Sequence, residues 1–184
     1  MMMSYTKLPL RLLVTDPVTK FQLAFSEQGA LLLAGFAGVR TQASARGLIL
    51  NAVTERDLSA AVAMLQTLFP AVDVGTVEVV HLDQGSMEPY VHVNVKTPED
   101  YHGFVIAQLN ERGGSIESLV DTDSHYKLVS ATAPLARMLG YDKVLADTTR
   151  NSATVEYSFV DYRPVQSQSP DPPRAPAAEG RSET

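Results

Sequence analysis

The sequence contains no cysteine, which excludes disulfides, thiolate zinc sites and cysteine nucleophiles. It has no apolar run that approaches the roughly 20 residues of a membrane-spanning helix, and residues 1–7 lack the apolar core of a signal peptide. No Gly-x-x-x-x-Gly-Lys-Ser/Thr stretch occurs, so no such loop is present to cradle nucleotide phosphates. We therefore expect a cytoplasmic protein that binds neither GTP nor ATP and has no membrane partner.

The sequence has fewer basic than acidic residues. The 184 residues carry 15 Lys and Arg against 21 Asp and Glu, which gives a formal net charge of -6. The chain as a whole is therefore not an electrostatic partner for nucleic acid, and we expect no DNA binding. A basic patch has to form locally against this background. The apolar fraction of 45% is ordinary for a chain that buries a core, and the length suits one good domain or two small ones.

Side chains suited to catalysis or metal binding are scattered along the chain. The histidines are His81, His92, His102 and His125. His81 and Asp83 have the spacing of a metal pair, but the pattern places no third ligand on the same face, so we interpret the histidines as surface or half-buried strand residues. Asp121 and Asp123 fall near a turn without the remainder of a calcium-binding loop. We expect no catalytic activity, no metal and no cofactor.

The first half of the chain alternates between strand and helix patterns. Its strand patterns cover residues 8–15, 39–42, 48–53 and 72–82. Its helical patterns cover residues 19–37 and 55–69. Three glycines weaken the first helix, and Gly75 interrupts the last strand. Thr54 and Asp57 resemble a capping box at the start of the second helix.

The second half repeats this order. Its strand patterns cover residues 88–95, 115–120, 125–132 and 153–162. Thr97 is predicted to cap the first helix, with Pro98 at the first helical position, where its missing N–H is harmless. Gly113 fits the left-handed position that ends this helix. Pro134 is predicted to open the second helix in the same way as Pro98.

The order strand, helix, strand, strand, helix, strand is that of a ferredoxin-like domain. The predicted fold class is therefore α+β, with two tandem ferredoxin-like (βαββαβ) domains at residues 8–83 and 87–165. Residues 166–184 are proline-rich and polar without an apolar period, so we expect a disordered C-terminal tail there.

Several motifs of the second half occur in an order that resembles a known family. They are Glu88-Pro89-Tyr90, Thr97-Pro98-Glu99-Asp100-Tyr101-His102-Gly103, Pro134-Leu135, Thr148 and the stretches 109–114, 138–141 and 157–165. Together they are similar to the C-terminal domain, domain V, of elongation factor G. Residues 12–17, 47–53, 54–70 and 72–82 are similar in spacing and pattern to domain III of the same family. The sequence shows no counterpart of the GTPase domain or of domain IV.

The resemblance implies a non-enzymatic elongation-factor-G-like fragment or paralogue associated with translation. The implied partner is the ribosome, at ribosomal RNA near the factor site, or a translational GTPase. Asn110 and Gly114 stand where this domain type often places basic side chains, which leaves Arg112 as the basic residue there. The candidate ribosome contacts are Arg112, Arg150 and Lys96.

Two interpretations of these basic residues stay open. Lys96, Lys127, Arg112, Arg150 and Arg163 have the chemistry to contact phosphate, but acidic residues are interleaved with them, as on a solvated surface of mixed charge. The alternative function is a tandem ferredoxin-like module that binds a protein partner or a small ligand and is unrelated to the ribosome. The presence of a basic face on the second half distinguishes the two hypotheses.

Overall fold

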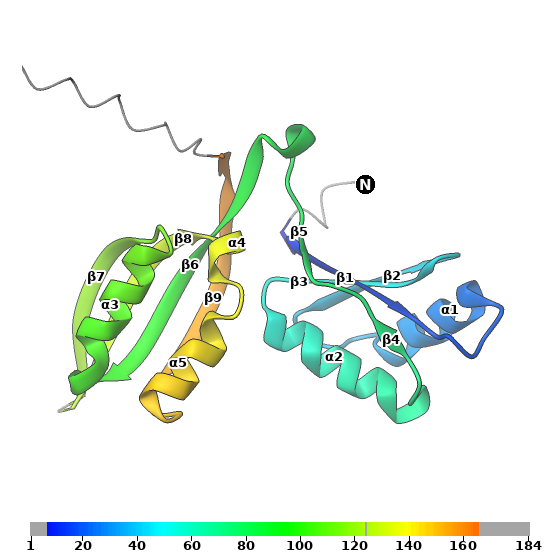
Figure 1. Ribbon diagram of the computed structural model, residues 1–184, viewed down its shortest axis with the longest axis horizontal. Helices are drawn as coiled ribbons and strands as arrows, with labels where there is room; N and C mark the ends of the chain where they lie inside the picture. The colour runs from blue at the N-terminus through cyan, green and yellow to red at the C-terminus, as the bar shows by residue number, and fades with distance from the viewer. Residues whose placement is uncertain (1–6, 124, 166–184) are drawn as a thin grey trace, which may run out of the picture.

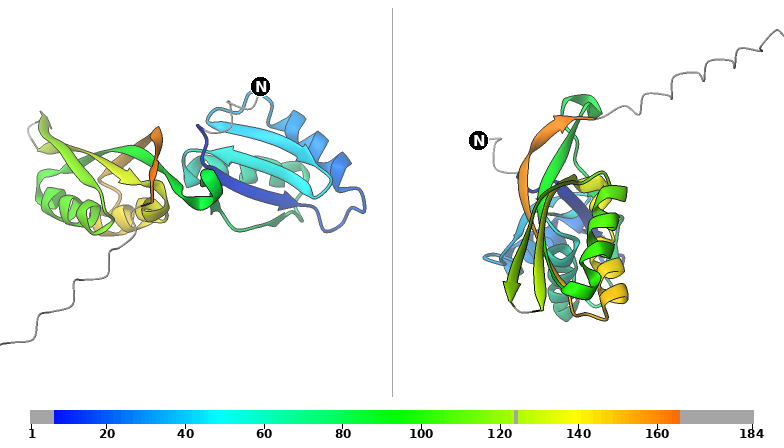
Figure 2. Two further views of the ribbon diagram at one scale, coloured as in Figure 1. Left: turned by 90° about the horizontal axis from the view of Figure 1, so that it is seen from above. Right: turned by 90° about the vertical axis from the view of Figure 1, so that its left-hand side faces the viewer.

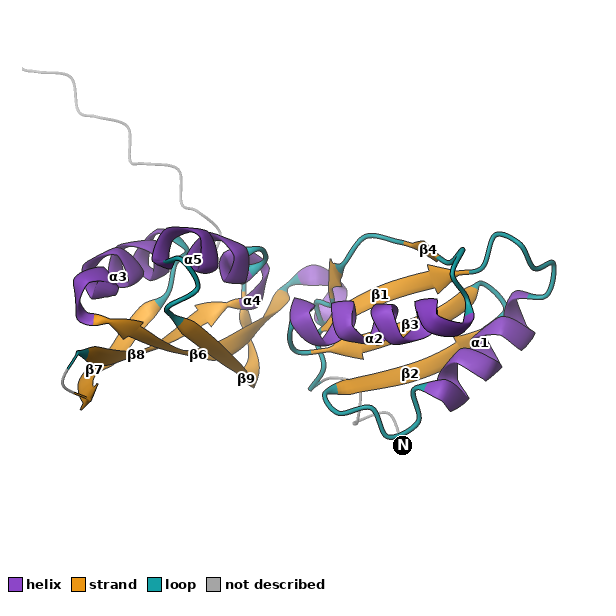
Figure 3. Ribbon diagram, turned by 90° about the horizontal axis from the view of Figure 1, so that it is seen from below, coloured by secondary structure: helices purple, strands orange, loops and turns teal. Residues whose placement is uncertain are grey.

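The computed structural model describes residues 7–123 and 125–165, and the tail expected at 166–184 lies outside them. Two antiparallel sheets lie next to each other, each covered by helices on one face (Figures 1 and 3). The predicted α+β class with tandem ferredoxin-like units is confirmed.

The first unit contains a sheet in the order β2-β3-β1-β4, with β5 also pairing with β1. Its elements are β1 (Leu10–Thr15), α1 (Gln22–Leu32), β2 (Val39–Ser44), β3 (Gly47–Ala52), α2 (Glu55–Leu68), β4 (Asp73–Val74) and β5 (Glu78–Val79). The strand predicted at 72–82 is therefore two short strands along the same edge of β1, separated at Gly75 as the sequence indicated. The Gly75 N–H nevertheless donates to the Leu13 carbonyl at 2.9 Å, so the segment stays against β1.

The two helices of the first unit differ in detail from the predicted ones. The first helix is clearly shorter than predicted, and the second differs in its N-terminal cap. The N-cap at Thr54 is confirmed, because its Oγ1 accepts from the Asp57 N–H at 3.0 Å. The Asp57 carboxylate accepts from the Thr54 hydroxyl at 2.7 Å, in place of the backbone contact of a full capping box. The first helix ends at Leu32, before Gly35 and Gly38, which have positive φ. Gly29 remains inside it and brings α1 close to β3, since a Cβ there would lie 2.8 Å from Leu48.

The second unit contains a sheet in the order β7-β8-β6-β9. Its elements, after the short η1 (Asp83–Gly85), are β6 (Met87–Pro98), η2 (Glu99–Tyr101), α3 (His102–Glu111), β7 (Ser115–Asp123), β8 (Tyr126–Pro134), α4 (Leu135–Met138), α5 (Tyr141–Thr149) and β9 (Thr154–Pro164). The predicted left-handed Gly113 is confirmed, with φ 73. The Gly114 N–H donates to the Leu109 carbonyl at 2.8 Å and closes the end of α3.

The predicted start of α3 at Thr97-Pro98 is wrong. Both residues belong to β6, where they pair with Lys127 and Tyr126 of β8. Thr97 is fully buried and makes no cap hydrogen bond at the helix start, and Pro98 has an extended ψ of 149. The sheet register therefore overrides the local cap signal, and α3 begins at His102 after a turn of 3-10 helix.

The predicted second helix of this unit is divided in two. Gly140 has φ 72 and breaks the chain direction between α4 and α5. Pro134 is the last residue of β8, where it pairs with Tyr90, and so does not occupy the first helical position. The resulting corner between α4 and α5 projects towards the first unit.

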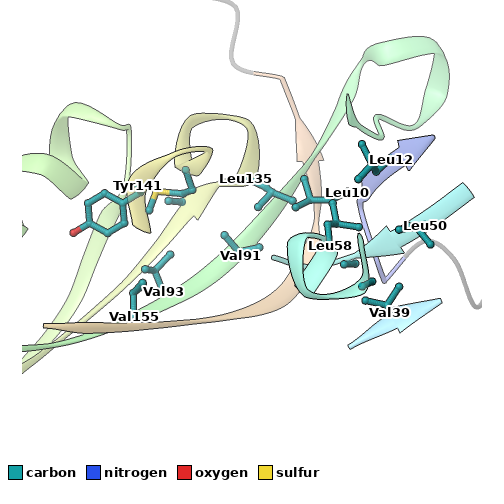
Figure 4. Packing of buried hydrophobic residues seen from close by; sticks show 14 of the residues in the cluster. Leu10, Leu12, Val39, Leu50, Leu58, Val91, Val93, Leu135, Tyr141 and Val155 are labelled. Atoms are coloured by element: carbon teal, nitrogen blue, oxygen red, sulfur yellow. The ribbon is translucent and has the colours of Figure 1, made fainter. Parts of the chain in front are cut away.

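The cores of the two units meet at this corner. In the second unit, Val91, Val93 and Val95 of β6 are fully buried beneath the helices. Leu10 of β1 and Leu135 of α4 lie side by side between the units (Figure 4) and line a small pocket together with Val53, Met138 and Leu139 among others. Apolar burial therefore continues from one unit into the other.

Candidate functional site

The three basic residues predicted to contact the ribosome lie at two different ends of the second unit. Lys96 of β6 pairs with Thr154 at the start of β9, shortly after Arg150, so Lys96 and Arg150 share one end. Arg112 follows α3 at the other end, where Ser115 pairs with Thr132 next to the start of β6 (Figure 1). The fold therefore does not bring the three side chains into one surface.

Arg112 connects α3 to the corner between α4 and α5. Its Nη1 donates to the Arg137 carbonyl at 2.7 Å and to the Leu139 carbonyl at 3.3 Å. These carbonyls lie at the end of α4, where a helix leaves acceptors without intrahelical partners. Its guanidinium also lies 5.1 Å from the centre of the Tyr141 ring. Arg112 thus holds the end of α3 and the adjoining corner in place.

Lys96 and Arg150 occupy the opposite end. Lys96 is exposed, and its Nζ lies 5.3 Å from the centre of the Tyr126 ring. Arg150 is exposed and adopts a left-handed conformation, φ 54, at the C-cap of α5. Lys127 on the neighbouring strand pairs with Asp121 at 2.7 Å and with Glu99 at 3.4 Å. These bonds raise the pKa of Lys127, with the Asp121 hydrogen bond contributing most. This end carries acidic partners alongside its cations.

Two further arginines, Arg137 and Arg163, lie at the same end of the second unit as Arg112. The guanidinium of Arg163 lies 4.6 Å from the centre of the Tyr90 ring, and its Nε donates to Asp161 at 2.9 Å. Arg137 is exposed and packs over Gly113: a Cβ at Gly113 would lie 2.7 Å from the Arg137 Nη1. The sequence indicates Arg163 as a candidate for phosphate contact but gives no such signal for Arg137. The broken helix explains this, since only the separate α4 places Arg137 in a last turn beside the α3 terminus.

A pocket of about 430 Å³ lies at Arg163 and reaches Gly113, over which Arg137 packs. It is lined by Tyr90, Gly113, Ser115, Thr132, Arg163 and Pro164. We call this pocket, together with the side chains of Arg137 and Arg163, the arginine pocket. Burial raises the pKa of Tyr90, and the charges of Arg163 and Arg137 act in the opposite direction. The Tyr90 hydroxyl therefore stays protonated, and the neutral Tyr90 ring lies against the guanidinium of Arg163.

A polar network adjoins the arginine pocket at Thr132. The Thr132 hydroxyl donates to the Glu117 carboxylate, which also lies 3.1 Å from His92 Nε2. The Thr132 hydrogen bond is the main reason that the pKa of Glu117 is lowered, and the His92 interaction adds to it. Glu117 is thus held ionised and already has partners. The groups left to meet a ligand are the guanidinium groups and the Ser115 hydroxyl, which together suit an oxyanion such as a phosphate.

Metal-ligating side chains do not converge in the described part of the chain, where no group of three or more His, Asp or Glu residues has the arrangement to hold an ion. Among the residues placed by the structure, no helix is long and apolar enough to cross a membrane.

Comparison with known proteins finds a family model that is similar to the second unit. Residues 85–172 match the family model described as "Elongation factor G C-terminus". The whole arrangement is similar to the crystal structure of ttk003000868 from Thermus thermophilus, with a TM-score of 0.59 and 13% sequence identity over 85% of this chain. At that identity the likeness concerns the fold alone. This chain spans 40% of the length of the Thermus thermophilus chain.

Proposed function

We propose that this chain is a translation-factor-like protein that associates with the ribosome without catalysing a reaction, because residues 85–172 match the family model of the elongation factor G C-terminus. The contact is made by the arginine pocket, which receives a phosphate group of ribosomal RNA. Arg137 and Arg163 contact the RNA, and Arg112 acts as a positioning residue behind them.

The observation that carries this proposal is the convergence of three arginines at one end of the second unit. Arg112 fixes the corner that presents Arg137, and Arg163 lies across the same pocket. Guanidinium groups bind phosphate through planar, paired donors, so Arg163 in the pocket lining, with Arg137 beside it over Gly113, suits a backbone phosphate. The pocket thereby provides a local basic site on a chain of net charge -6.

The same surroundings limit the strength of binding. Asp161 pairs with Arg163, and Glu88 raises the pKa of Tyr90 nearby, so acidic groups flank the site. We therefore propose a modest affinity that falls as salt is added, because each neutralised phosphate releases counterions.

For the first unit we propose a role like that of domain III of elongation factor G. The support is its ferredoxin-like topology directly before the elongation factor G C-terminal-like domain, and the 85% of the chain that the Thermus thermophilus structure covers. We also propose that neither unit hydrolyses GTP, since the sequence has no phosphate-binding loop of the P-loop type. Calorimetry with GTP and Mg²⁺ tests this, and saturable micromolar binding would contradict it.

Co-sedimentation with purified ribosomes through a sucrose cushion at low salt tests the ribosome contact. The variant Arg137→Glu/Arg163→Glu is expected to lose binding while its circular dichroism stays unchanged. The matched control is Lys96→Glu/Arg150→Glu, which changes the same charge at the opposite end of the unit. It also tests the two other candidates that the sequence indicated. Arg112 is left intact, because its replacement would remove hydrogen bonds that hold α4.

The outcomes separate the hypotheses. Loss of binding only in the Arg137/Arg163 variant supports the arginine pocket. Loss only in the Lys96/Arg150 variant moves the contact to the other end. If the wild-type protein does not co-sediment even at low salt, the ribosome proposal fails and the tandem module that binds a protein partner or a small ligand replaces it.

A further inference from the structure

The sheet of the first unit has one face without helices. Both α1 and α2 lie against the opposite face, as the view from above shows (Figure 2, left). Along β1, Leu10, Leu12 and Val14 point to the helices and are buried, so the intervening Arg11 and Leu13 lie on the open face. The exposed side chains there are available to a partner.

Three polar residues form a row across this open face. Arg40 of β2 is opposite Asn51 of β3, and Asn51 is opposite Arg11 of β1. Directly paired residues of antiparallel strands project from the same face, and neighbouring strands lie about 4.8 Å apart. The two exposed arginines therefore stand on either side of Asn51, and we call these three residues the arginine row.

Among the residues that the structure describes, the two cations of the row have no partners. Within residues 7–123 and 125–165, neither Arg11 nor Arg40 makes an ion pair, a side-chain hydrogen bond or a ring contact. Asn51 between them is only 3% exposed, and in the same described ranges its amide makes no side-chain hydrogen bond. The N–H groups of the two arginine side chains are therefore available to hydrogen-bond an incoming acceptor.

An apolar row adjoins the arginine row. Ile49 of β3 is opposite Leu13 of β1, and Leu13 is 37% exposed. None of the residues of β1, β2 and β3 is aromatic. The face consequently lacks the ring platform on which single-stranded RNA stacks its bases. A basic row next to an aliphatic one complements a protein segment that carries a carboxylate and an apolar side chain.

We propose that this open face docks an acidic segment of a partner protein. A carboxylate of the segment lies between Arg11 and Arg40, over Asn51, and an aliphatic side chain next to it covers Leu13 and Ile49. Glu78 of β5 is opposite Arg11 and places a negative charge on the far side of the row. It therefore disfavours segments with a carboxylate on that side and sets the register of docking. The proposal concerns the first unit and does not depend on ribosome binding.

The test titrates the full-length protein with a fluorescein-labelled peptide of four Glu-Leu repeats and follows fluorescence anisotropy at low salt. The charge-reversed peptide of four Lys-Leu repeats and an oligouridylate of similar length are titrated in parallel. The variant Arg11→Gln/Arg40→Gln is expected to weaken binding of the Glu-Leu peptide at least tenfold, and Leu13→Ser to weaken it several-fold. Arg46→Gln, an exposed arginine of the β2–β3 turn, is the matched control and is expected to bind like wild type.

A second readout places the peptide on the molecule. In ¹H–¹⁵N spectra, the side-chain amide of Asn51 is expected to shift on titration with the Glu-Leu peptide. The side-chain amide of Asn94, on the sheet of the other unit, is expected to stay in place. The proposal is overturned if wild type does not bind the Glu-Leu peptide, if the double variant binds it equally well, or if the Asn51 amide does not respond. It is also overturned if oligouridylate binds and displaces the Glu-Leu peptide, since the open face of the first unit would then be an RNA site.

Discussion

Glu55 and Gly140 join the two units, since a carboxylate oxygen of Glu55 accepts the Gly140 N–H at 2.6 Å. Glu55 opens α2 of the first unit, and Gly140 is the left-handed residue between α4 and α5 of the second. Because the chain turns sharply at Gly140, its N–H points out of the helices and towards α2. The bond lies beside the apolar contact of Leu10 with Leu135. One charge-assisted hydrogen bond and a small apolar contact thus hold the units together.

The first prediction concerns this link. Glu55→Ala is expected to lower the free energy of unfolding by about 1.5–3 kcal/mol, the usual range for a hydrogen bond to a charged group. Glu55→Gln, which keeps an acceptor, should cost less. Urea denaturation measures both. Arg56→Ala, at the exposed neighbouring position, is the control. A neutral Glu55→Ala would show that the bond does not form in solution.

The sequence predicts those parts of the fold that neighbouring residues determine, and it predicts less well the parts that depend on residues distant in the sequence. The alternation of Val91, Val93 and Val95 predicts β6, and the strand indeed buries these residues. Gly113 is identified from local chemistry alone and has the expected left-handed φ. Thr97 and Pro98 look locally like a helix start, but pairing with β8 holds them in the sheet. Local signals fail where a partner strand distant in sequence decides the conformation.

In the candidate site, too, the sequence predicts what is determined locally and misses what depends on contacts between distant residues. Arg112 is placed correctly at the end of a helix, but its role in holding α4 depends on contacts across 25 residues of sequence. Arg137 escapes notice because the helix appears continuous through Gly140 in the sequence. Only the break at Gly140 creates the short α4 that places Arg137 over Gly113. The arginine row is likewise invisible until strand pairing sets Arg40 and Arg11 on either side of Asn51.

The second prediction compares the two cores. Leu65→Ala in α2 and Leu109→Ala in α3 are each expected to cost about 2–5 kcal/mol, since both side chains are fully buried. Leu31→Ala in α1, where the side chain is 76% exposed, should be within about 0.5 kcal/mol of wild type. Equilibrium unfolding in urea measures all three. A small effect at Leu65 or Leu109 would mean that the helix concerned does not pack in this register.

The third prediction concerns two buried tyrosines. The Tyr141 hydroxyl is buried and has no hydrogen-bond partner within residues 7–123 and 125–165, whereas the Tyr157 hydroxyl donates to Asp142 at 2.5 Å. Tyr141→Phe should therefore be neutral or stabilising by up to about 1 kcal/mol, and Tyr157→Phe should destabilise by about 1–2 kcal/mol. Thermal unfolding measures both. The opposite order of the two variants would contradict the assigned hydrogen bonds.

The fourth prediction concerns alkaline pH. Burial raises the pKa of Tyr141 from 10.0 to about 12, and burial also raises the pKa of Tyr157. The folded state therefore keeps protons that the unfolded chain releases above about pH 10. The stability due to these groups is complete below pH 10 and is lost as the pH rises towards 12. Each such group contributes a slope of about 1.4 kcal/mol per pH unit in this window.

Urea midpoints at pH 9, 10 and 11 test this dependence. The midpoint is expected to fall between pH 10 and 11, and Tyr141→Phe is expected to make the fall shallower. An equally steep fall in that variant would assign the effect to other groups.

The central claim is that the arginine pocket faces ribosomal RNA, and site-directed crosslinking measures this most directly. The sequence has no cysteine, so a single introduced cysteine carries a photoreactive probe to one place. Ser115→Cys places it at the rim of the arginine pocket, and Thr148→Cys places it on α5 near the opposite end of the same unit. We expect ribosomal RNA crosslinks from position 115 that disappear with Arg137→Glu/Arg163→Glu, and few or none from position 148. Equal crosslinking from both positions, or crosslinking from position 148 alone, would contradict the claim.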